Sequence, residues 1–158
     1  MDTDNGTRWL SDEEQRAWRA HLDVNRLLMY QLERDLQPFG LTMNDYEILV
    51  NLSESDEHRL RMSDLAASTL QSKSRLSHQI TRMEKAGLVR RESCEEDKRG
   101  LFAVLTETGW ETMRHVAPHH VESVRRHFID RMPPEDLEHL HATLSPIAEK
   151  LRAQRGRL

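Results

Sequence analysis

The chain has 158 residues, of which 32% are charged and 37% hydrophobic. This length suits one ordinary domain, or a small domain with an oligomerisation arm, and the apolar content argues against wholesale disorder. The longest apolar run, Leu101–Leu105, is far shorter than the roughly 20 residues that cross a bilayer, which excludes a membrane span. The first residues form neither a basic leader nor an apolar stretch, and one cysteine cannot make an intramolecular disulfide. We therefore expect a cytoplasmic protein.

The formal net charge of −4 argues at first against a nucleic-acid partner, but the charge is unevenly distributed. Residues 71–100 hold eight basic and five acidic side chains, a net charge of +3. The other 128 residues hold 15 basic and 22 acidic side chains, a net charge of −7. The chain is therefore bipolar, and its positive pole lies in one short segment.

A long amphipathic helix is predicted first, over Ser11–Gln37, because apolar residues recur there at close to the helical period. Ser11 followed three residues later by Glu14 is the pattern of a capping box, and Pro38 with Gly40 ends the segment. One face of this helix is apolar, so it needs a partner surface.

A helix-turn-helix is predicted next. Residues 42–52 form a helix that the threonine at its start caps, and a polar loop, Ser53–Arg59, follows. Two short helices, Met62–Thr69 and Ser72–Ala86, are joined by a tight turn, which is typical of this motif. Gly87 suits the left-handed position that closes the second of them.

A β-hairpin directly behind the helix-turn-helix is predicted to be a wing. Its strands are Leu88–Glu92 and Leu101–Leu105, with a charged turn between them. Asp97, Lys98 and Arg99 lie at the turn, where an arginine is placed to enter a narrow minor groove of DNA while the aspartate holds its guanidinium. The alternative is a polar turn whose charges only keep an edge hairpin soluble.

Two more long helices are predicted at the C-terminal end. The first runs from Thr106 to about Arg131 with a kink at Pro118, and the second starts after Pro133 and Pro134. A single copy would leave the apolar faces of these helices and of the first helix exposed to water, so we expect two chains to intertwine as a homodimer. The alternative is a monomer whose terminal helices pack on each other.

The predicted fold is therefore mainly α with a small β wing, a winged helix-turn-helix core flanked by long N- and C-terminal dimerisation helices. Residues 42–105 would form the DNA-binding domain, and residues 11–38 with 106–153 the dimerisation region. The ends, residues 1–10 and 154–158, are expected to be flexible.

The helix from Ser72 has two faces of opposite character. Leu76, Ile80 and Met83 form a buried stripe on a helical wheel. The opposite side consists of hydrogen-bond donors, some of them charged, which a helix in a major groove needs to reach base edges and phosphates. The expected base contacts are Ser74, Arg75, Ser77 and His78, and the expected phosphate contacts are Lys73, Arg82 and Lys85.

Two other interpretations of this face are less favoured. An ordinary solvated helix has a similar composition, but the net charge of +3 on the surrounding segment favours DNA. A winged helix used as a protein–protein interaction module would present apolar residues on this face, and it presents polar and basic ones. DNA binding is therefore the preferred interpretation.

Four motifs occur in order along the chain. They are Leu65-Ala66, Ser72 to Ile80 with Arg82 to Val89, Asp97-Lys98-Arg99-Gly100, and Val104-Leu105-Thr106 leading to Gly109. In this order and spacing, which extend from about Leu10 to Leu151, the chain resembles the MarR family of winged helix-turn-helix transcriptional regulators.

The resemblance implies a homodimer whose first, fifth and sixth helices form the interface. It implies that each recognition helix, with base-facing positions within Ser72–Arg82, enters a major groove of a palindromic double-stranded site, and that Arg99, held by Asp97, enters the flanking minor groove. Members commonly repress a neighbouring gene and their own gene, and release DNA when a small, often aromatic and anionic, effector binds between the dimer and DNA-binding regions. The candidates to line such a pocket are Trp18, Met29, Tyr46, His115 and His119, with core packing as the alternative for the Trp, Met and Tyr.

Other sensing and catalytic classes are not favoured. The family's peroxide-sensing branch uses a cysteine near the first helix, whereas Cys94 lies on the wing. His115 and His119 have the spacing of a zinc-sensing pair, but Pro118 disturbs their helix, so we expect no metal site and no cofactor and keep a metal-responsive regulator as an alternative. The sequence contains no metalloprotease motif, phosphate-binding loop or nucleophile elbow, so we do not expect an enzyme.

Overall fold

The computed structural model describes residues 6–93 and 100–155, which form helices and one small sheet. The α-helices are α1 (Asp12–Leu36), α2 (Met43–Glu54), α3 (Met62–Ser68), α4 (Lys73–Lys85), α5 (Glu107–His127) and α6 (Pro134–Arg155). The strands are β1 (Arg59–Arg61), β2 (Val89–Ser93) and β3 (Leu101–Leu105). The predicted fold class, mainly α with a small β wing, is confirmed.

Local capping explains where the helices begin. Ser11 and Thr42 each form a capping box, because each side chain accepts a hydrogen bond from the third residue of its helix, and that residue's carboxylate accepts from the cap's N–H. The hydroxyls of Ser72 and Thr106 cap α4 and α5 in the same position without the return bond. Gly87 follows α4 with φ +74°, the left-handed conformation expected of it.

The core lies where α2, α3 and α4 pack against the sheet and the first half of α5. The sheet is antiparallel throughout, in the order β1-β3-β2, with Val89 opposite Leu105 and Arg59 opposite Val104. The fully buried side chains of this core include Ile48, Leu49, Leu52, Leu65, Leu76, Ile80, Met83, Val89 and Val116. Because each such side chain contributes about 1.5–3 kcal/mol on burial, this cluster is what holds α4 and the wing in place.

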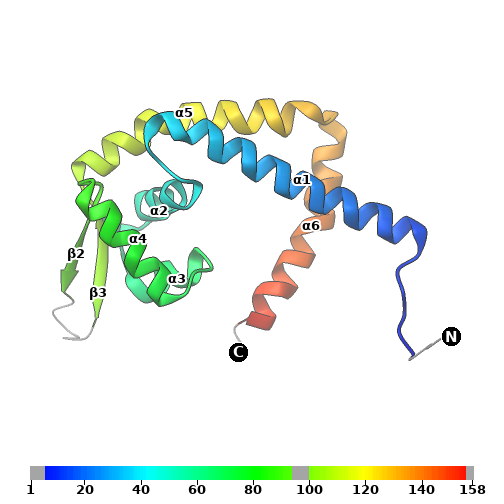
Figure 1. Ribbon diagram of the computed structural model, residues 1–158, viewed down its shortest axis with the longest axis horizontal. Coiled ribbons are helices and arrows are strands. Elements are labelled where there is room, and N and C mark those ends of the chain that lie inside the picture. The colour runs from blue at the N-terminus through cyan, green and yellow to red at the C-terminus, as the bar shows by residue number, and fades with distance from the viewer. Residues whose placement is uncertain (1–5, 94–99, 156–158) are drawn as a thin grey trace.

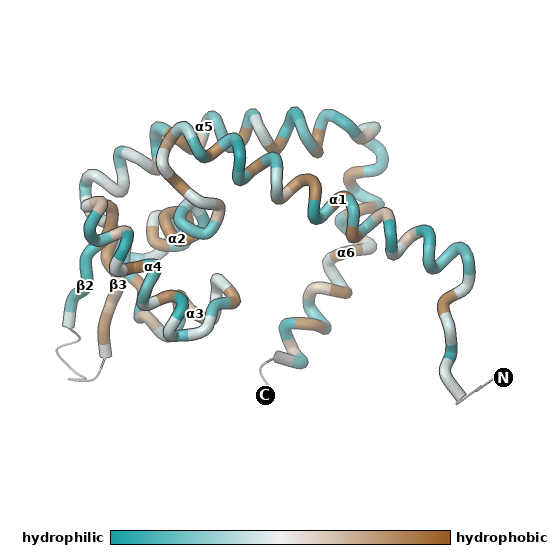
Figure 2. Tube along the Cα trace, viewed as in Figure 1, coloured by the Kyte–Doolittle hydropathy of each residue, from teal (hydrophilic) through white to brown (hydrophobic). Residues whose placement is uncertain are grey.

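The long helices extend away from this core. In Figure 1, α1 and α5 lie side by side along the top of the molecule, and α6 descends from the far end of α5, well away from the wing. Figure 2 shows apolar segments along α1 and α6 outside the winged core. None of the described side chains of α6 is buried, and only Leu32 and Leu36 are buried on α1. Within the part of the chain that is described, no helix is both long and apolar enough to cross a membrane.

Two elements differ from the sequence-based expectation. The predicted loop Ser53–Arg59 ends in strand β1, because Glu57 and His58 adopt positive φ angles of 55° and 54° and turn the chain back toward β3. The fifth helix ends at His127 instead of Arg131, since Phe128 leaves the helical region at φ −134° and a short 3-10 turn follows. The helix continues through Pro118, the position of the predicted kink.

Candidate DNA interface

The exposed face of α4 carries every residue of that helix that the sequence nominated for DNA contact. Leu76, Ile80 and Met83 are at most 1% exposed and face the core, as predicted. The nominated residues are all exposed: Ser72, Lys73, Ser74, Arg75, Ser77, His78, Arg82 and Lys85. The arrangement therefore presents hydroxyl, imidazole, guanidinium and ammonium groups together on one side of one helix, and their contacts with DNA remain predictions.

A buried carboxylate anchors α4 to the start of α2. Asp45 is 1% exposed, and its Oδ1 accepts hydrogen bonds from Arg82 Nη2 (2.6 Å) and Gln79 Nε2 (3.0 Å). Its Oδ2 accepts from the backbone N–H of Thr42 (2.9 Å). Burial raises the pKa of Asp45, but the hydrogen bonds from Thr42, Gln79 and Arg82 outweigh it and hold the pKa below its ordinary value. Arg82, nominated as a phosphate contact, is thus also a structural partner, although 55% of its side chain remains exposed.

A second polar network ties the middle of α4 to β2. Arg91 Nη2 donates to the backbone carbonyl of Ser77 (2.7 Å) and to Thr81 Oγ1 (3.1 Å). Its other guanidinium nitrogen forms an ion pair with the carboxylate of Glu84, which also accepts from the Arg91 backbone N–H (2.9 Å). The recognition helix and the wing are therefore linked by charged hydrogen bonds as well as by the core.

Sequence reasoning missed the roles of Asp45 and Arg91. The signal for Arg91 was present, because Glu84 stood out as the one acid beside a basic face and such an acid needs a cationic partner. No comparable signal marked Asp45, whose partners Gln79 and Arg82 lie 34 and 37 residues away along the chain.

The predicted wing tip lies outside the described residues. Asp97, Lys98 and Arg99 belong to it, as does Cys94. The strands β2 and β3 on either side pair in register from Val89 with Leu105 to Ser93 with Leu101, which is the hairpin that the sequence predicted. The role of Arg99 in a minor groove stays a prediction.

Rings from α2, from α5 and from the 3-10 turn that precedes α2 lie close together. Tyr46 is buried and its ring lies 4.3 Å from that of His120, while Phe39 lies 5.8 Å from the ring of His115 and 5.0 Å from that of His119. Burial lowers the pKa of His120, and burial with the nearby Glu54 charge raises that of Tyr46. Three of the five nominated pocket residues are thus brought to one region of the fold.

The other two pocket candidates lie elsewhere. Trp18 is 52% exposed on α1 and stacks on His21, and Met29 is 40% exposed. Both lie on the part of α1 that has no buried residue. Among the described residues, no group of three or more His, Cys, Asp or Glu side chains is arranged to hold a metal ion.

Comparisons with known proteins agree with this geometry. A sequence model of the MarR family matches residues 39–100. The structure superposes with a TM-score of 0.89 on AbsC, a MarR family transcriptional regulator from Streptomyces coelicolor, which is 76% identical over 93% of this chain and 99% of AbsC. This chain belongs to the MarR family of transcriptional regulators.

Two further similar proteins are less closely related in sequence. Sco3205 from Streptomyces coelicolor, solved in complex with DNA, is 45% identical over 92% of this chain and 91% of its own, with a TM-score of 0.88. The HTH-type transcriptional regulator PecS of Dickeya dadantii (strain 3937) is 26% identical over 129 residues, 81% of this chain and 77% of PecS. The family recognised from the sequence motifs is therefore confirmed.

Proposed function

We propose that this MarR family regulator is a homodimeric, effector-responsive repressor that binds a palindromic double-stranded DNA site. The observation that carries the proposal is the exposed, donor-rich face of α4. Asp45 holds this helix through Gln79 and Arg82, and Arg91 holds it through Ser77 and Thr81. A helix fixed in this way loses little conformational entropy when it binds. More of the binding free energy of its side chains is then available for DNA recognition. The relative Sco3205, solved in complex with DNA, supports the same partner.

The dimer is supported by apolar side chains that one copy leaves uncovered. Leu27 is 62% exposed and Tyr30 63% on α1, and Ile147 is 51% exposed and Leu151 60% on α6. Patches of this kind on a soluble protein mark association surfaces, and a second copy with the same helices would cover them.

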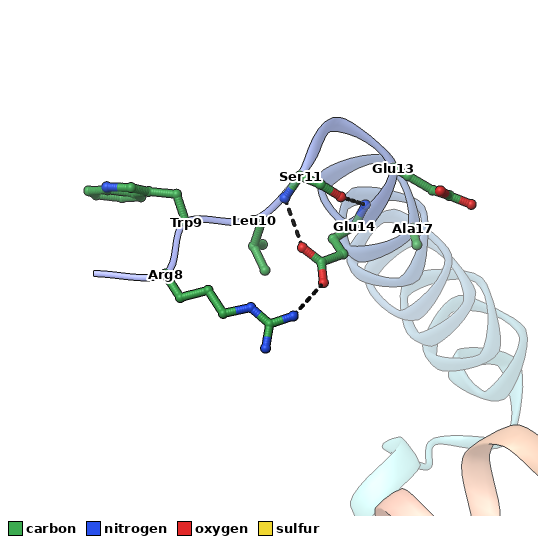
Figure 3. Close-up of a pocket in the computed structure, with 7 residues that line it drawn as sticks. All are labelled: Arg8, Trp9, Leu10, Ser11, Glu13, Glu14 and Ala17. Carbon is green, nitrogen blue, oxygen red and sulfur yellow. Dashed lines mark hydrogen bonds and ion pairs between the residues drawn. The ribbon is translucent and has the colours of Figure 1, made fainter. Parts of the chain in front are cut away.

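The segment before α1 extends this uncovered surface. Trp9 is 79% exposed and, in Figure 3, points away from the rest of the molecule, while Arg8 reaches back to the Glu14 carboxylate (3.7 Å). A hollow of about 620 Å³ lies among these residues, Leu10 and Ala17. We assign it to the same dimer surface, with the partner copy as the covering group.

An aromatic effector is supported by the rings at the junction of α2 and α5. Five rings lie close together where α2, which anchors α4, meets α5, which leads to the proposed dimer region. They are those of Phe39, Tyr46, His115, His119 and His120. A planar ligand among these rings would act by binding more tightly to one spacing of the two recognition helices than to another. A regulator of this kind acts where the DNA is, so we place it in the cytoplasm. We also assign it no catalytic activity, because its proposed role requires only binding.

The proposal is tested by titrating the purified protein against the DNA that flanks its own gene. Wild type should form a specific complex, and Arg75→Ala should change which bases are tolerated, by about 1–3 kcal/mol at the contacted position. Lys150→Ala on α6 is the matched control, since it removes an exposed cation outside the winged core. Failure of wild type to bind would overturn the proposed function, and equal weakening of Arg75→Ala on every operator variant would overturn its base-reading role.

A further inference from the structure

A polar cluster joins the end of α1 to the end of α5. The Oδ2 atom of Asp35 accepts a hydrogen bond from Ser123 Oγ at 2.5 Å and another from His127 Nε2 at 3.0 Å. The Nη2 atom of Arg126 lies 3.5 Å from the same oxygen. Ser123 is only 1% exposed, so its hydroxyl needs this partner. One carboxylate of α1 thus receives three donors from the last turns of α5.

The cluster keeps this carboxylate charged. The hydrogen bond from Ser123 lowers the pKa of Asp35 most. Burial raises that pKa, but the contacts with His127 and Arg126 lower it further, so it lies below its ordinary value. An ionised carboxylate only accepts hydrogen bonds, so His127 carries a proton on Nε2 in this contact. The contacts are therefore charge-assisted, and such bonds are short and directional.

The cluster lies at the boundary between the winged core and the exposed helices. Leu32 and Leu36, the buried residues of α1, are within one turn of Asp35. After Leu36 the chain passes through a 3-10 turn into α2 of the core, and after His127 it turns toward α6. In Figure 1, α1 and α5 run together and α6 leaves the far end of α5. The two helices that connect the core to the proposed dimer region are therefore joined at Asp35.

Apolar packing alone would fix this joint only loosely. The hydrophobic contribution of Leu32 and Leu36 depends on buried area and has no direction, so it tolerates small rotations of α1 against α5. A hydrogen bond weakens steeply when its angle or length changes. Because the joint lies between the dimer helices and the core that carries α4, a change in how α1 crosses α5 would move the two recognition helices of a dimer relative to each other.

We propose that Asp35, held by Ser123 and His127, is a positioning residue that sets the distance between the two recognition helices and so the half-site spacing that the dimer accepts. The cluster lies on α1 and α5, outside the donor-rich face of α4, so it acts through the placement of α4. The inference rests on the proposed function, because half-site spacing has a meaning only for a dimer on a two-part DNA site.

The first test compares operators that differ in half-site spacing. One base pair added or removed between the half-sites moves them by about 3.4 Å and rotates them by about 34°. Affinity is measured on the native spacing, on both altered spacings and on a single half-site, for wild type, Asp35→Asn and Ser123→Ala. Asp23→Asn is the matched control, since it removes the same charge from an exposed position on the same helix. Thermal unfolding and sedimentation velocity show whether each variant folds and dimerises.

Wild type and Asp23→Asn should lose about 100-fold in affinity when the spacing changes, because the two half-sites can no longer be bound together. Asp35→Asn should lose only about tenfold, since a looser joint lets the second recognition helix follow its half-site, and Ser123→Ala should lie between these values. Affinity for a single half-site should be the same for all four proteins. This last measurement separates a positioning role from a general loss of folded protein.

A second test needs no DNA. A spin label is attached to α4 of each copy through Lys85→Cys, in a Cys94→Ser background that removes the one native cysteine. Double electron–electron resonance then gives the distribution of distances between the two labels. Asp35→Asn should broaden this distribution relative to wild type and to Asp23→Asn, because the crossing of α1 and α5 is no longer fixed.

The inference is overturned if Asp35→Asn keeps the wild-type spacing preference, or if it loses affinity equally on every operator and on the half-site. An unchanged label distribution also overturns it. If Asp35→Asn does not fold or dimerise, Ser123→Ala decides, because it removes one hydrogen bond and leaves the carboxylate with His127 and Arg126. Failure of wild type to bind any operator is a different result: it removes the proposed function, while the label distribution still tests the joint.

Discussion

At the scale of single residues, Asp45 shows how one carboxylate serves two elements. It completes the capping box of α2 with Thr42, and from the same side chain it accepts hydrogen bonds from Gln79 and Arg82 of α4. A buried carboxylate is costly unless its acceptor sites are filled, and here they are filled by donors from both helices. The hydrogen bonds from Gln79 and Arg82 thereby fix α4 to the start of α2.

Asp45→Asn should lower the free energy of unfolding at pH 7 by about 2 kcal/mol, because hydrogen bonds to a charged group contribute about 1.5–3 kcal/mol. The folded-state pKa of Asp45 is below its unfolded value, so this stabilisation is fully present above the unfolded pKa and is lost as the pH falls through the folded pKa. Urea unfolding across acidic pH measures it. The difference between wild type and Asp45→Asn should shrink toward low pH, whereas Asp136→Asn, at an exposed position on α6, should change little at any pH. A difference that persists unchanged in acid would contradict this role.

At the scale of elements, α5 is placed against the wing by a residue with no side chain. Gly109 lies in the first turn of α5, where a Cβ atom would stand 2.0 Å from the backbone oxygen of Leu88 and 2.8 Å from Leu105 Cδ1. The hydroxyl of Thr106 also donates to the Gly87 carbonyl (2.6 Å), so the start of α5 and the end of α4 meet at the base of the hairpin. The long helix therefore leaves the winged core at an angle set by close backbone contact.

Gly109→Ala should cost about 3 kcal/mol of unfolding free energy, because the added methyl group overlaps backbone that cannot rotate away. Gly87→Ala is the comparison, since its Cβ would meet nothing within 4 Å and the cost arises only from the positive φ, about 1–2 kcal/mol. Chemical denaturation of both variants separates the two causes. A Gly109→Ala protein as stable as Gly87→Ala would show that the Leu88 contact relaxes at little cost.

At the scale of the whole molecule, the apolar residues divide the chain into a closed part and an open part. The winged core buries its large side chains, whereas α6 and most of α1 expose theirs. A helix of this kind gains most of its stability from packing its apolar face against another element. The exposed faces therefore support the proposed dimer, in which a second copy would cover them.

Ile147→Asp should convert the protein from dimer to monomer and abolish operator binding, because a carboxylate placed in an apolar interface is desolvated without a partner. Ala142→Asp introduces the same group on the opposite face of α6 and should leave the dimer intact. Sedimentation velocity gives the oligomeric state of each variant. A monomeric wild type, or an Ile147→Asp protein that remains dimeric, would contradict the proposed assembly.

Short-range patterns made most of the fold predictable from the sequence. Some features depend only on neighbours within about one or two helical turns, so they can be predicted from the sequence. These are the caps at Ser11, Thr42, Ser72 and Thr106, the left-handed Gly87 and the buried stripe of α4. The exposed donors of α4 follow from the same periodicity. Strand β1 was missed because three residues carry too little alternation to predict a strand.

The sequence by itself thus determined most of the elements, the exposed donor-rich face of α4 and the family. Only the tertiary structure decided what holds that face in place, because the bonds from Gln79 and Arg82 to Asp45 and from Arg91 to Ser77 join residues that are distant along the chain and have no periodic relation. It also decided that Asp35 meets Ser123 and His127, since they come from separate helices that meet only when the chain has folded. Secondary structure depends mainly on local sequence, whereas a binding surface depends on how the packed elements bring distant side chains together.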